Sequence, residues 1–517
     1  MSENPTENKV YVIEVDYYKI SQDDIFTLYL SDTQFRTKPT DTGYESISFW
    51  PDIEQGLYFK TSLFGEDRPK ARTNASRGDV VLRDAEQKYA ALVLDPDNVF
   101  VGYSIRCKRG GLKDDYANFT TTATAIITDV LPRVNKANTM IIKCAGAKDQ
   151  INEAPVNTTV YQGNNPKSDI YENQGLTPRA GKVVPRAFGQ IFNASPELIN
   201  TLNEMRQIHD GAIEKFDQIR DKGIVLPSSL FAATLAGGTF TLTNQPAGQV
   251  TCDVKGAKIG GTYTAKAGAI IEHILTSALT SYGSLNTSSF QNFALSAPVG
   301  LYLDASQMMG NARERLRTLA DAVDELLSGI LAFLEEDEFG NLYMREFDSP
   351  GTPEYSFEAG DIEKIEFIRI IQPVYRVKVN YRKNYSVQDE GSVAELVDTE
   401  YKELFAEPYS QAYAEDLTIR DTYPLAREVT IDSLLANQSD AQDLADKFFG
   451  IYGQPMGLFD VTLRNRRDAA QLVRCGSTQT FTYPFTGFTA GKDCRIVDRG
   501  VDTKTSSVKL TCFGPLD

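Results

Sequence analysis

Histidine is the commonest general base at neutral pH, and this chain contains only two, His209 and His273. His209 is followed directly by Asp210, and Ser195 lies upstream, so the three residue types of a nucleophilic triad are present. The G-x-S-x-G sequence that would hold such a serine on a sharp turn is absent. We therefore interpret His209 as a turn residue and His273 as a structural residue on a packed helix, and we assign no catalytic residue.

A partial calcium-loop pattern follows the longest apolar repeat of the chain. Glu335, Asp337, Gly340 and Glu346 stand at positions one, three, six and twelve of a window that resembles an EF-hand loop. Position one is glutamate, and position five is Phe339, which supplies no side-chain ligand. The segment also runs into a predicted strand and not into a second helix. We therefore interpret it as a turn between a helix and a strand.

The cysteines are not spaced as metal ligands. None of them form a C-x-x-C pair, and most lie in strand-like segments, which predicts buried and reduced thiols. A metal or iron–sulfur site would need several of them to converge in space, and that alternative stays open. The six are Cys107, Cys144, Cys252, Cys475, Cys494 and Cys512.

The remaining short motifs favour no cofactor or metal. The R-G-D tripeptide at residues 77–79 is interpreted as a loop that leads into a strand. The carboxylate pairs at residues 23–24 and 114–115 are adjacent in sequence, so they tend to point apart and not across a cleft. No P-loop, G-x-G-x-x-G or H-E-x-x-H sequence occurs. Trp50 is the only tryptophan, beside 25 tyrosines and 27 phenylalanines, which favours core and interface packing over a carbohydrate platform.

Composition sets limits on the whole chain. The 41% of hydrophobic residues suffices for ordinary cores, and 517 residues correspond to about three or four domains. The net charge of −17 argues against a general nucleic-acid binder, because such a protein needs a positive surface. The N-terminal residues lack the features of a signal peptide, and no apolar run is long enough to span a bilayer. We expect synthesis in a cytoplasm and no stable membrane association.

Residues 1–150 are predicted to form a β-barrel or sandwich, because short apolar runs recur there at regular spacing. Residues 33–45 and 65–77 are predicted to be polar or charged loops. Residues 151–182 are rich in Asn, Gly, Pro and Thr, which predicts a linker or an extended arm. The expected strands lie at residues 10–15, 26–32, 53–59, 79–82, 89–94, 100–107, 119–131 and 140–144.

Residues 183–300 are predicted to form a β-rich module with one helix. Ile213, Phe216 and Ile219 recur every third residue, which leaves a short helix and an irregular strand both open. Lys222 and the glycine after it predict a turn. Further elements are expected at residues 238–242 and 249–254, as two strands joined by a loop, and at residues 266–282, as an amphipathic helix.

Residues 301–400 are predicted to form a central α/β domain. Apolar residues at three- and four-residue steps predict a helix over residues 311–335, buried against a sheet. That sheet is expected to include residues 342–347. Residues 373–382 alternate with period two, as a strand does.

Residues 401–517 are predicted to form a helix and a second small β-barrel. The helix is expected at residues 439–449, with Ser439 and Gln442 as a capping box and Gly450 as the stop. The strands of the barrel are expected at residues 457–463, 478–483, 494–498 and 507–512.

Four short motifs follow one another between residues 183 and 256. They read P-x-A-F-G-x-x-x-N-x-x-P, H-D-G, R-D-x-G and G-x-F-x-L-x-x-x-P-x-G-x-V-T-x-D-V-x-G. In this order they resemble the tail-tip and baseplate hub proteins of long-tailed bacteriophages. The later sequence V-x-V-N-Y-x-x-N-Y, which begins at Val377, is similar to the same family.

The resemblance implies a mainly β fold with α+β insertions. Two tube-like β-barrel or sandwich domains would accompany a central helix-on-sheet domain and the β-rich insertion module. With two such barrels in each subunit, a homotrimer would place six similar barrels around its axis and so form a pseudo-sixfold ring.

The resemblance also implies a structural protein of the virion tail tip and not an enzyme. The ring would be assembled in the host cytoplasm. It would join the tail tube or the distal tail protein to a central fibre or spike. Its lumen would pass the tape-measure protein and then DNA during genome ejection. The alternatives are a receptor- or carbohydrate-binding tail protein and a cell-wall hydrolase.

Overall fold

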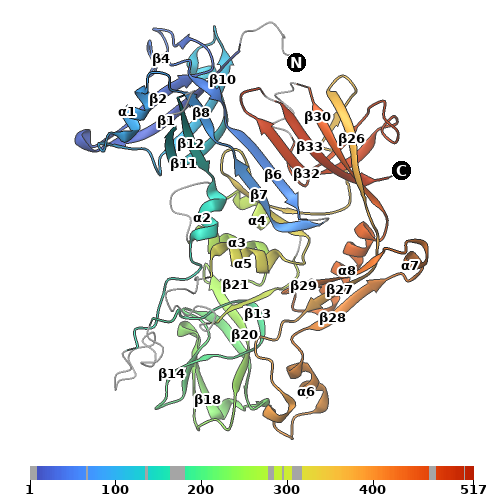
Figure 1. Ribbon diagram of the computed structural model, residues 1–517. Helices are drawn as coiled ribbons and strands as arrows, with labels where there is room; N and C mark the ends of the chain where they lie inside the picture. Colours follow the sequence, from blue (N-terminus) through green and yellow to red (C-terminus); the bar gives the residue numbers. More distant parts are fainter. Residues whose placement is uncertain are drawn as a thin grey trace.

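The computed structural model describes residues 9–65, 68–133, 138–163, 181–277, 284–293, 296–304, 317–464, 473–505 and 507–516 (Figure 1). Strands dominate these residues, and the helices lie between or beside the sheets. The predicted mainly β fold with α+β insertions is confirmed. Within the described residues no helix is long and apolar enough to cross a bilayer.

An eight-stranded sheet holds most of the N-terminal part. Its order is β2-β1-β10-β11-β12-β8-β5, with β9 beside β1, and neighbouring strands in this order run antiparallel. One face buries an apolar core that includes Ile13, Ile105 and Ile127. The strands are β1 (Lys9–Lys19), β2 (Asp24–Ser31), β5 (Ile53–Gln55), β8 (Val80–Arg83), β9 (Asn98–Val99), β10 (Ser104–Gly111), β11 (Thr120–Arg133) and β12 (Thr139–Ala145).

A ten-stranded sheet combines strands from both ends of the chain. Its strands are β6 (Tyr58–Phe64), β7 (Pro69–Arg77), β23 (Ala332–Glu336), β24 (Leu342–Glu346), β25 (Tyr355–Phe357), β26 (Ile362–Ile371), β30 (Met456–Leu463), β31 (Thr478–Phe481), β32 (Lys492–Asp502) and β33 (Val508–Pro515). The order is β24-β23-β7-β6-β32-β33-β30-β26. Figure 1 shows β6 and β7 beside the C-terminal strands. The predicted domain boundaries stay predictions, and this pairing joins segments from three of the predicted domains.

Two smaller sheets build the module around residues 183–300. One holds β13 (Arg186–Ala194), β16 (Ile213–Asp221), β17 (Ile224–Val225), β20 (Val250–Ile259), β21 (Thr262–Tyr263) and β22 (Gly300–Leu303). The other holds β14 (Glu197–Asn200), β15 (Met205–Gln207), β18 (Phe231–Thr234) and β19 (Thr239–Leu242). The strands predicted at residues 238–242 and 249–254 are confirmed, but they pair within different sheets.

The segment with the three-residue apolar spacing is a strand, β16. A β-bulge between Phe216 and Gln218 shifts the register against β20. Because a bulge adds one residue to one strand, it moves the inward positions by one step. Phe216 and Ile219 are therefore three residues apart and still face the same core. The turn predicted at Lys222 is confirmed, since it joins β16 to β17.

The other elements complete the molecule. A three-stranded sheet holds β27 (Val374–Tyr381), β28 (Ser410–Glu415) and β29 (Arg427–Asp432), and a two-stranded one holds β3 (Phe35–Arg36) and β4 (Ser48–Phe49). The largest core lies around α3 and α5, near the centre of Figure 1. The helices are α1 (Lys88–Leu94), α2 (Ala147–Glu153), α3 (Ala267–Thr276), α4 (Thr287–Gln291), α5 (Leu319–Leu327), α6 (Thr399–Ala406), α7 (Thr418–Thr422) and α8 (Gln438–Tyr452).

The charged loop predicted at residues 65–77 is wrong, because most of it is strand β7. Thr73 and Arg77 are buried on one face, whereas Lys70 and Asn74 are exposed on the other. This is the two-residue alternation of a strand. The period was hidden because Arg77, a charged residue, occupies an inward position. Arg77 of the R-G-D tripeptide is the last residue of β7, and the other two residues form the predicted loop that leads into β8.

The strand predicted at residues 89–94 is also wrong, because these residues belong to helix α1. The Asp84 carboxylate accepts hydrogen bonds from the backbone N–H groups of Tyr89 (3.0 Å) and Ala90 (2.9 Å). These bonds satisfy N–H groups that have no partner at a helix start. Alanine and leucine, which are frequent here, also favour a helix.

The long helix predicted at residues 311–335 is replaced by α5 and then strand β23, and residues 311–316 lie outside the described part. Thr318 and Asp321 form a capping box, with N–H···O distances of 2.8 and 3.2 Å. The chain turns at Gly329 and Leu331, whose φ angles are 80° and 50°. The apolar steps continue beyond α5 because every residue of β23 is buried. A strand buried on both faces cannot be told from a helix by periodicity.

The predicted C-terminal helix is confirmed as α8, but its ends differ. The N-cap residue is Asn437, so the capping box at Ser439 is wrong. The Gln442 amide donates to the carbonyl oxygen of Tyr413 at 3.0 Å and not to the helix start. Gly450, the predicted stop, lies inside the helix. The predicted helix at residues 266–282 is confirmed as α3 up to Thr276, and residues 278–282 lie outside the described part.

We expect Gly300→Ala to lower the free energy of unfolding by about 1–3 kcal/mol. A Cβ atom at this position of β22 would overlap the carbonyl oxygen of Gln190 in the adjacent backbone of β13. Gly450→Ala is the matched control, because its Cβ would meet nothing within 4 Å on helix α8. It should raise the free energy of unfolding by about 0.5–1 kcal/mol. Urea unfolding measures both, and equal midpoints would contradict the expectation.

Candidate functional site

Ser195, His209 and Asp210 do not form a catalytic triad. His209 is buried, its Nδ1 accepts a hydrogen bond from the Ala187 N–H at 3.1 Å, and its Nε2 lies 3.5 Å from Asp210. Burial lowers the pKa of His209 to about 4. The Ser195 hydroxyl is directed to the carbonyl oxygen of Val250, 3.5 Å away. Among the described residues, no hydrogen bond joins Ser195 to His209.

The second histidine and the sole tryptophan have local partners. The ring of His273, on α3, lies 6.1 Å from the ring of Phe188, which also contacts His209. Trp50 is 52% exposed, and the Lys88 ammonium lies 4.1 Å from its ring centroid. A cation on the indole face is a favourable contact, so one face of Trp50 is already in use.

The acids of the calcium-loop pattern have separate partners. Asp337 accepts hydrogen bonds from the backbone N–H groups of Phe339 and Asn341, both at 2.8 Å. Glu346 lies 3.4 Å from the Lys447 ammonium. The segment is a turn between two strands, β23 and β24, and not between a helix and a strand. Within the described residues, no three His, Cys, Asp or Glu side chains gather to hold a metal ion.

The cysteines and the acidic dipeptides do not form a shared site in the described structure. All six cysteines are free, five of them are buried and Cys144 is half-buried. Burial raises the pKa of Cys107 and of Cys494 to about 12, so both thiols are protonated at neutral pH. Asp114 accepts a hydrogen bond from the backbone N–H of Gly111, the last residue of β10, at 2.7 Å, and Asp115 pairs with Lys38 at 2.6 Å.

Four consecutive acids, residues 335–338, form a buried cluster that we call the acidic turn. Each is at most 4% exposed, which is unusual for carboxylates and requires nearby partners. Two of them, Glu335 and Asp337, stand in the calcium-loop pattern interpreted above as a turn, but no local pattern pointed to their counter-charges. These are four arginines: Arg345 on the adjacent strand β24, and Arg77, Arg474 and Arg499 from distant segments.

Glu336 connects a strand to a helix start. Its carboxylate lies 2.5 Å from the Arg77 guanidinium, and both side chains are at most 2% exposed. The same carboxylate accepts hydrogen bonds from the backbone N–H groups of Ala147 (2.9 Å) and Lys148 (3.1 Å), at the start of α2. Gly146 allows this approach, because a Cβ there would overlap both Arg77 and Glu336.

The pKa values of Glu335 and Glu338, two glutamates of the acidic turn, are shifted in opposite directions. Burial raises the pKa of Glu335, although Arg345 lies 2.9 Å away and opposes that effect. Burial acts in the same sense on Glu338, but the charges of Arg499 and Arg474 outweigh it and hold the pKa of Glu338 below its ordinary value. The pKa values of two carboxyl groups three residues apart are thus shifted in opposite directions.

The acidic turn also joins the two large sheets. The Thr124 N–H, on β11, donates to the carbonyl oxygen of Glu338 at 2.9 Å, and the Thr124 hydroxyl donates to that of Phe339 at 2.9 Å. Arg77, on β7, donates to the carbonyl oxygen of Thr124 at 3.1 Å. Satisfied buried polar networks of this kind rigidify the groups they connect. The turn is therefore a mechanical junction between the sheets.

Two apolar surfaces are exposed. The first is strand β26, at the edge of the ten-stranded sheet, where Phe367, Ile368 and Ile370 are each 45% exposed. Among the described strands, β26 pairs only with β30, so its outer backbone groups face away from the sheet. The second surface lies at the tip of the β1–β2 hairpin and near β9, and it comprises Ile20, Ile25, Leu94, Val99 and Val101.

Comparison with solved structures finds phage and prophage tail proteins. The 43 kDa tail protein of prophage MuSo2 from Shewanella oneidensis is similar at a TM-score of 0.42 and 10% identity, over 98% of this chain and 98% of that one. A tail protein from Neisseria meningitidis MC58 is similar at 0.41 and 9%, over 97% and 96%. The prophage tail protein gp18 from Listeria monocytogenes EGD-e is similar at 0.34 and 9%, over 98% and 94%. No protein-family model matches the sequence, and no curated protein sequence matches it.

Proposed function

We propose that this protein is a structural component of a bacteriophage tail, and that it acts as a ring-forming hub at the tail tip or baseplate. The four ordered motifs of residues 183–256 support the tail assignment, as does the later V-x-V-N-Y-x-x-N-Y sequence. The observation that carries the ring is the exposed apolar edge of β26. In this proposal the protein acts by assembly and not as an enzyme.

An exposed apolar edge strand needs a partner. It presents a row of backbone N–H and C=O groups, and proteins that stay monomeric commonly protect such edges with charges, proline or a covering element. On β26, Phe367, Ile368 and Ile370 are exposed beside the charged residues Glu366 and Arg369. Strand addition from a second subunit would satisfy the backbone groups and bury the apolar side chains. Repeated around an axis, a head-to-tail contact of this kind closes a ring.

The partners follow from the same proposal. The ring would be a homotrimer that contacts the tail tube or distal tail protein on one side and a central fibre or spike on the other. Tape-measure protein and DNA would pass through its lumen without a stable contact. The net charge of −17 agrees with a lumen that does not retain DNA. The acidic turn would keep the two large sheets of each subunit in one arrangement under load.

We expect the double variant Ile368→Lys/Ile370→Lys to remain folded and to lose ring assembly. Lysine on an edge strand opposes strand addition because its charge would be buried at the contact. Negative-stain electron microscopy and native mass spectrometry of the purified protein measure ring formation, and incorporation into tails measures the same step in the virion. Leu396→Lys is the control, because Leu396 is 88% exposed and precedes α6 outside the sheets. A monomeric wild-type protein, or rings formed equally by the double variant, would refute the proposal.

A further inference from the structure

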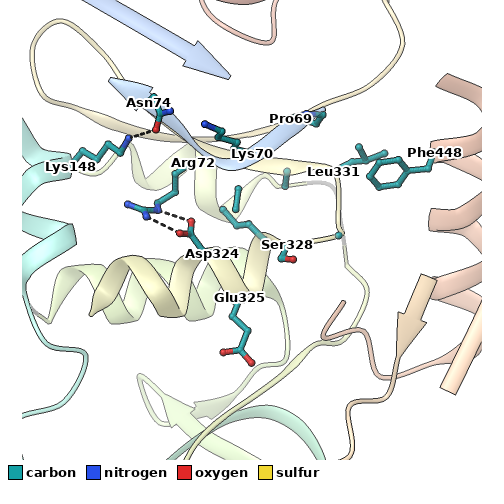
Figure 2. Close-up of a pocket in the computed structure, with 14 residues that line it drawn as sticks. Pro69, Lys70, Arg72, Asn74, Lys148, Asp324, Glu325, Ser328, Leu331 and Phe448 are labelled. Carbon is teal, nitrogen blue, oxygen red and sulfur yellow. Dashed lines mark hydrogen bonds and ion pairs between the residues drawn. The ribbon is translucent and has the colours of Figure 1, made fainter. Parts of the chain in front are cut away.

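A pocket of about 600 Å³ lies where β7, α2, α5 and α8 meet, away from the β26 edge (Figure 2). It has a basic end and an apolar end, and neither has a role in the proposed ring. Its lining includes Lys70, Arg72, Asn74, Lys148, Leu331 and Phe448.

Strand β7 supplies most of the basic end. Lys70, Arg72 and Asn74 are two residues apart, so they project from the same face of the strand. Arg72 is already neutralised, because its guanidinium forms two parallel hydrogen bonds to the Asp324 carboxylate, at 2.6 and 2.7 Å. A further bond at 2.7 Å joins Arg72 to Asn152.

The two lysines of the pocket have no carboxylate partner in the described part of the chain. Lys148 donates to the Asn74 side-chain oxygen at 3.1 Å, and Lys70 forms no ion pair with any described residue. Burial and the nearby Arg72 charge lower the pKa of Lys148 by more than the carboxylates of Glu336, Asp149 and Asp324 raise it. Glu325, which also lines the pocket, binds Lys383 at 2.6 Å. Figure 2 shows the Glu325 side chain directed away from Arg72.

The opposite end of the pocket is apolar. Figure 2 shows Phe448 and Leu331 on the far side from Lys148. Both side chains are held by the core, since Phe448 is 6% and Leu331 is 3% exposed. A ligand that fills the whole pocket must therefore carry anionic oxygens at one end and an apolar group at the other.

We propose that this pocket binds a polypeptide segment that carries two neighbouring carboxylates followed by an aromatic or aliphatic side chain. The carboxylates receive hydrogen bonds from Lys70 and Lys148, and the Asn74 amide nitrogen donates a further one. The apolar side chain lies against Phe448 and Leu331. A nucleic acid could supply both anions and a base that stacks on an aromatic ring, but the net charge of −17 disfavours its phosphates, so we infer a polypeptide. The inference does not depend on ring formation at β26.

The test titrates the full-length protein with three short peptides by isothermal titration calorimetry. The probe is acetyl-Glu-Glu-Phe-amide, and we expect saturable binding. Acetyl-Gln-Gln-Phe-amide removes the charges, and acetyl-Glu-Glu-Gly-amide removes the ring. Each of these two peptides should bind at least about tenfold more weakly than the probe, because charge-assisted hydrogen bonds and a buried ring each contribute at least that factor. No binding of the probe, or equal binding of the three peptides, would overturn the proposal.

Variants of the two lysines locate the site. Lys148→Ala and Lys70→Ala should each weaken probe binding about tenfold and leave the circular dichroism spectrum unchanged. Lys215→Ala removes the same charge from an exposed position on β16, outside the pocket, and should not change binding. Unchanged binding in both pocket variants would overturn the assignment. Tighter binding of a DNA duplex than of the peptide, lost in the same variants, would also overturn it and indicate a phosphate site.

Discussion

Arg77→Met should lower the free energy of unfolding by about 3–5 kcal/mol. The substitution leaves the Glu336 carboxylate buried without its counter-charge, and Glu336 is 2% exposed. Methionine fills much of the vacated volume, so the loss reports the charge and not a cavity. It also removes the bond from Arg77 to Thr124, so the two large sheets should separate more easily. Urea unfolding followed by circular dichroism and by the fluorescence of Trp50, the only tryptophan, measures the change.

Two further variants separate the buried charge from general disturbance. Arg77→Met/Glu336→Leu removes both charges and should recover much of the lost stability, because a buried ion pair can be replaced by apolar residues at little cost. Lys364→Met breaks an exposed pair with Glu366, whose side chains are 52% and 59% exposed, and should change stability by less than about 1 kcal/mol. Equal losses in Arg77→Met and Lys364→Met would show that the acidic turn does not depend on its counter-charges.

Acidification from pH 7 to pH 4 should lower the free energy of unfolding by about 3 kcal/mol through His209. Burial lowers the pKa of His209 from 6.5 in the unfolded chain to about 4 in the folded one. The unfolded state therefore binds more protons between these values. The contribution is complete above pH 6.5 and is lost as the pH falls toward 4. The charged groups that face His209 are Asp210, which opposes the shift, and Arg186 and His273, which increase it.

The His209→Gln variant tests this dependence. Between pH 7 and pH 4 its free energy of unfolding should fall by about 3 kcal/mol less than that of the wild type, as measured by urea unfolding at each pH. Carboxylates titrate equally in both proteins, so the difference isolates the histidine. His273→Gln removes the only other histidine, which is exposed, and should change the pH dependence much less. Parallel pH profiles for the wild type and His209→Gln would show that His209 is not buried as a neutral ring.

Local sequence patterns predicted many elements of this fold. The two-residue alternation that predicted β27 lies within one element. The same is true of the three- and four-residue apolar steps that predicted α3 and α8. The failures have local causes as well. The charged residues of β7 are typical of a loop, and β23 shows no two-residue alternation because it is buried throughout. The charge or the apolar run of a segment does not show which neighbouring elements will pack against it.

The candidate sites could be predicted only in part. Glu335 and Asp337 stand out in the sequence only because their pattern resembles a calcium loop, and we interpreted that pattern as a turn. Their surroundings contain arginines that come from positions more than a hundred residues away, such as Arg77 and Arg474. The basic end of the pocket likewise needs Lys148 to meet β7, which was not predicted as a strand. No spacing rule connects such residues, because their proximity results from strand pairing between distant segments.

By itself, the sequence determined the mainly β character, most strand and helix positions and the resemblance to tail hub proteins, since these depend on short-range periodicity and short motifs. The tertiary structure alone decided that β6 and β7 join the C-terminal sheet and that four consecutive acids are buried against four arginines. It also decided that β26 is left as an exposed apolar edge. The physical reason is that burial and strand pairing depend on which distant segments lie on each side, and that information is not local to any segment.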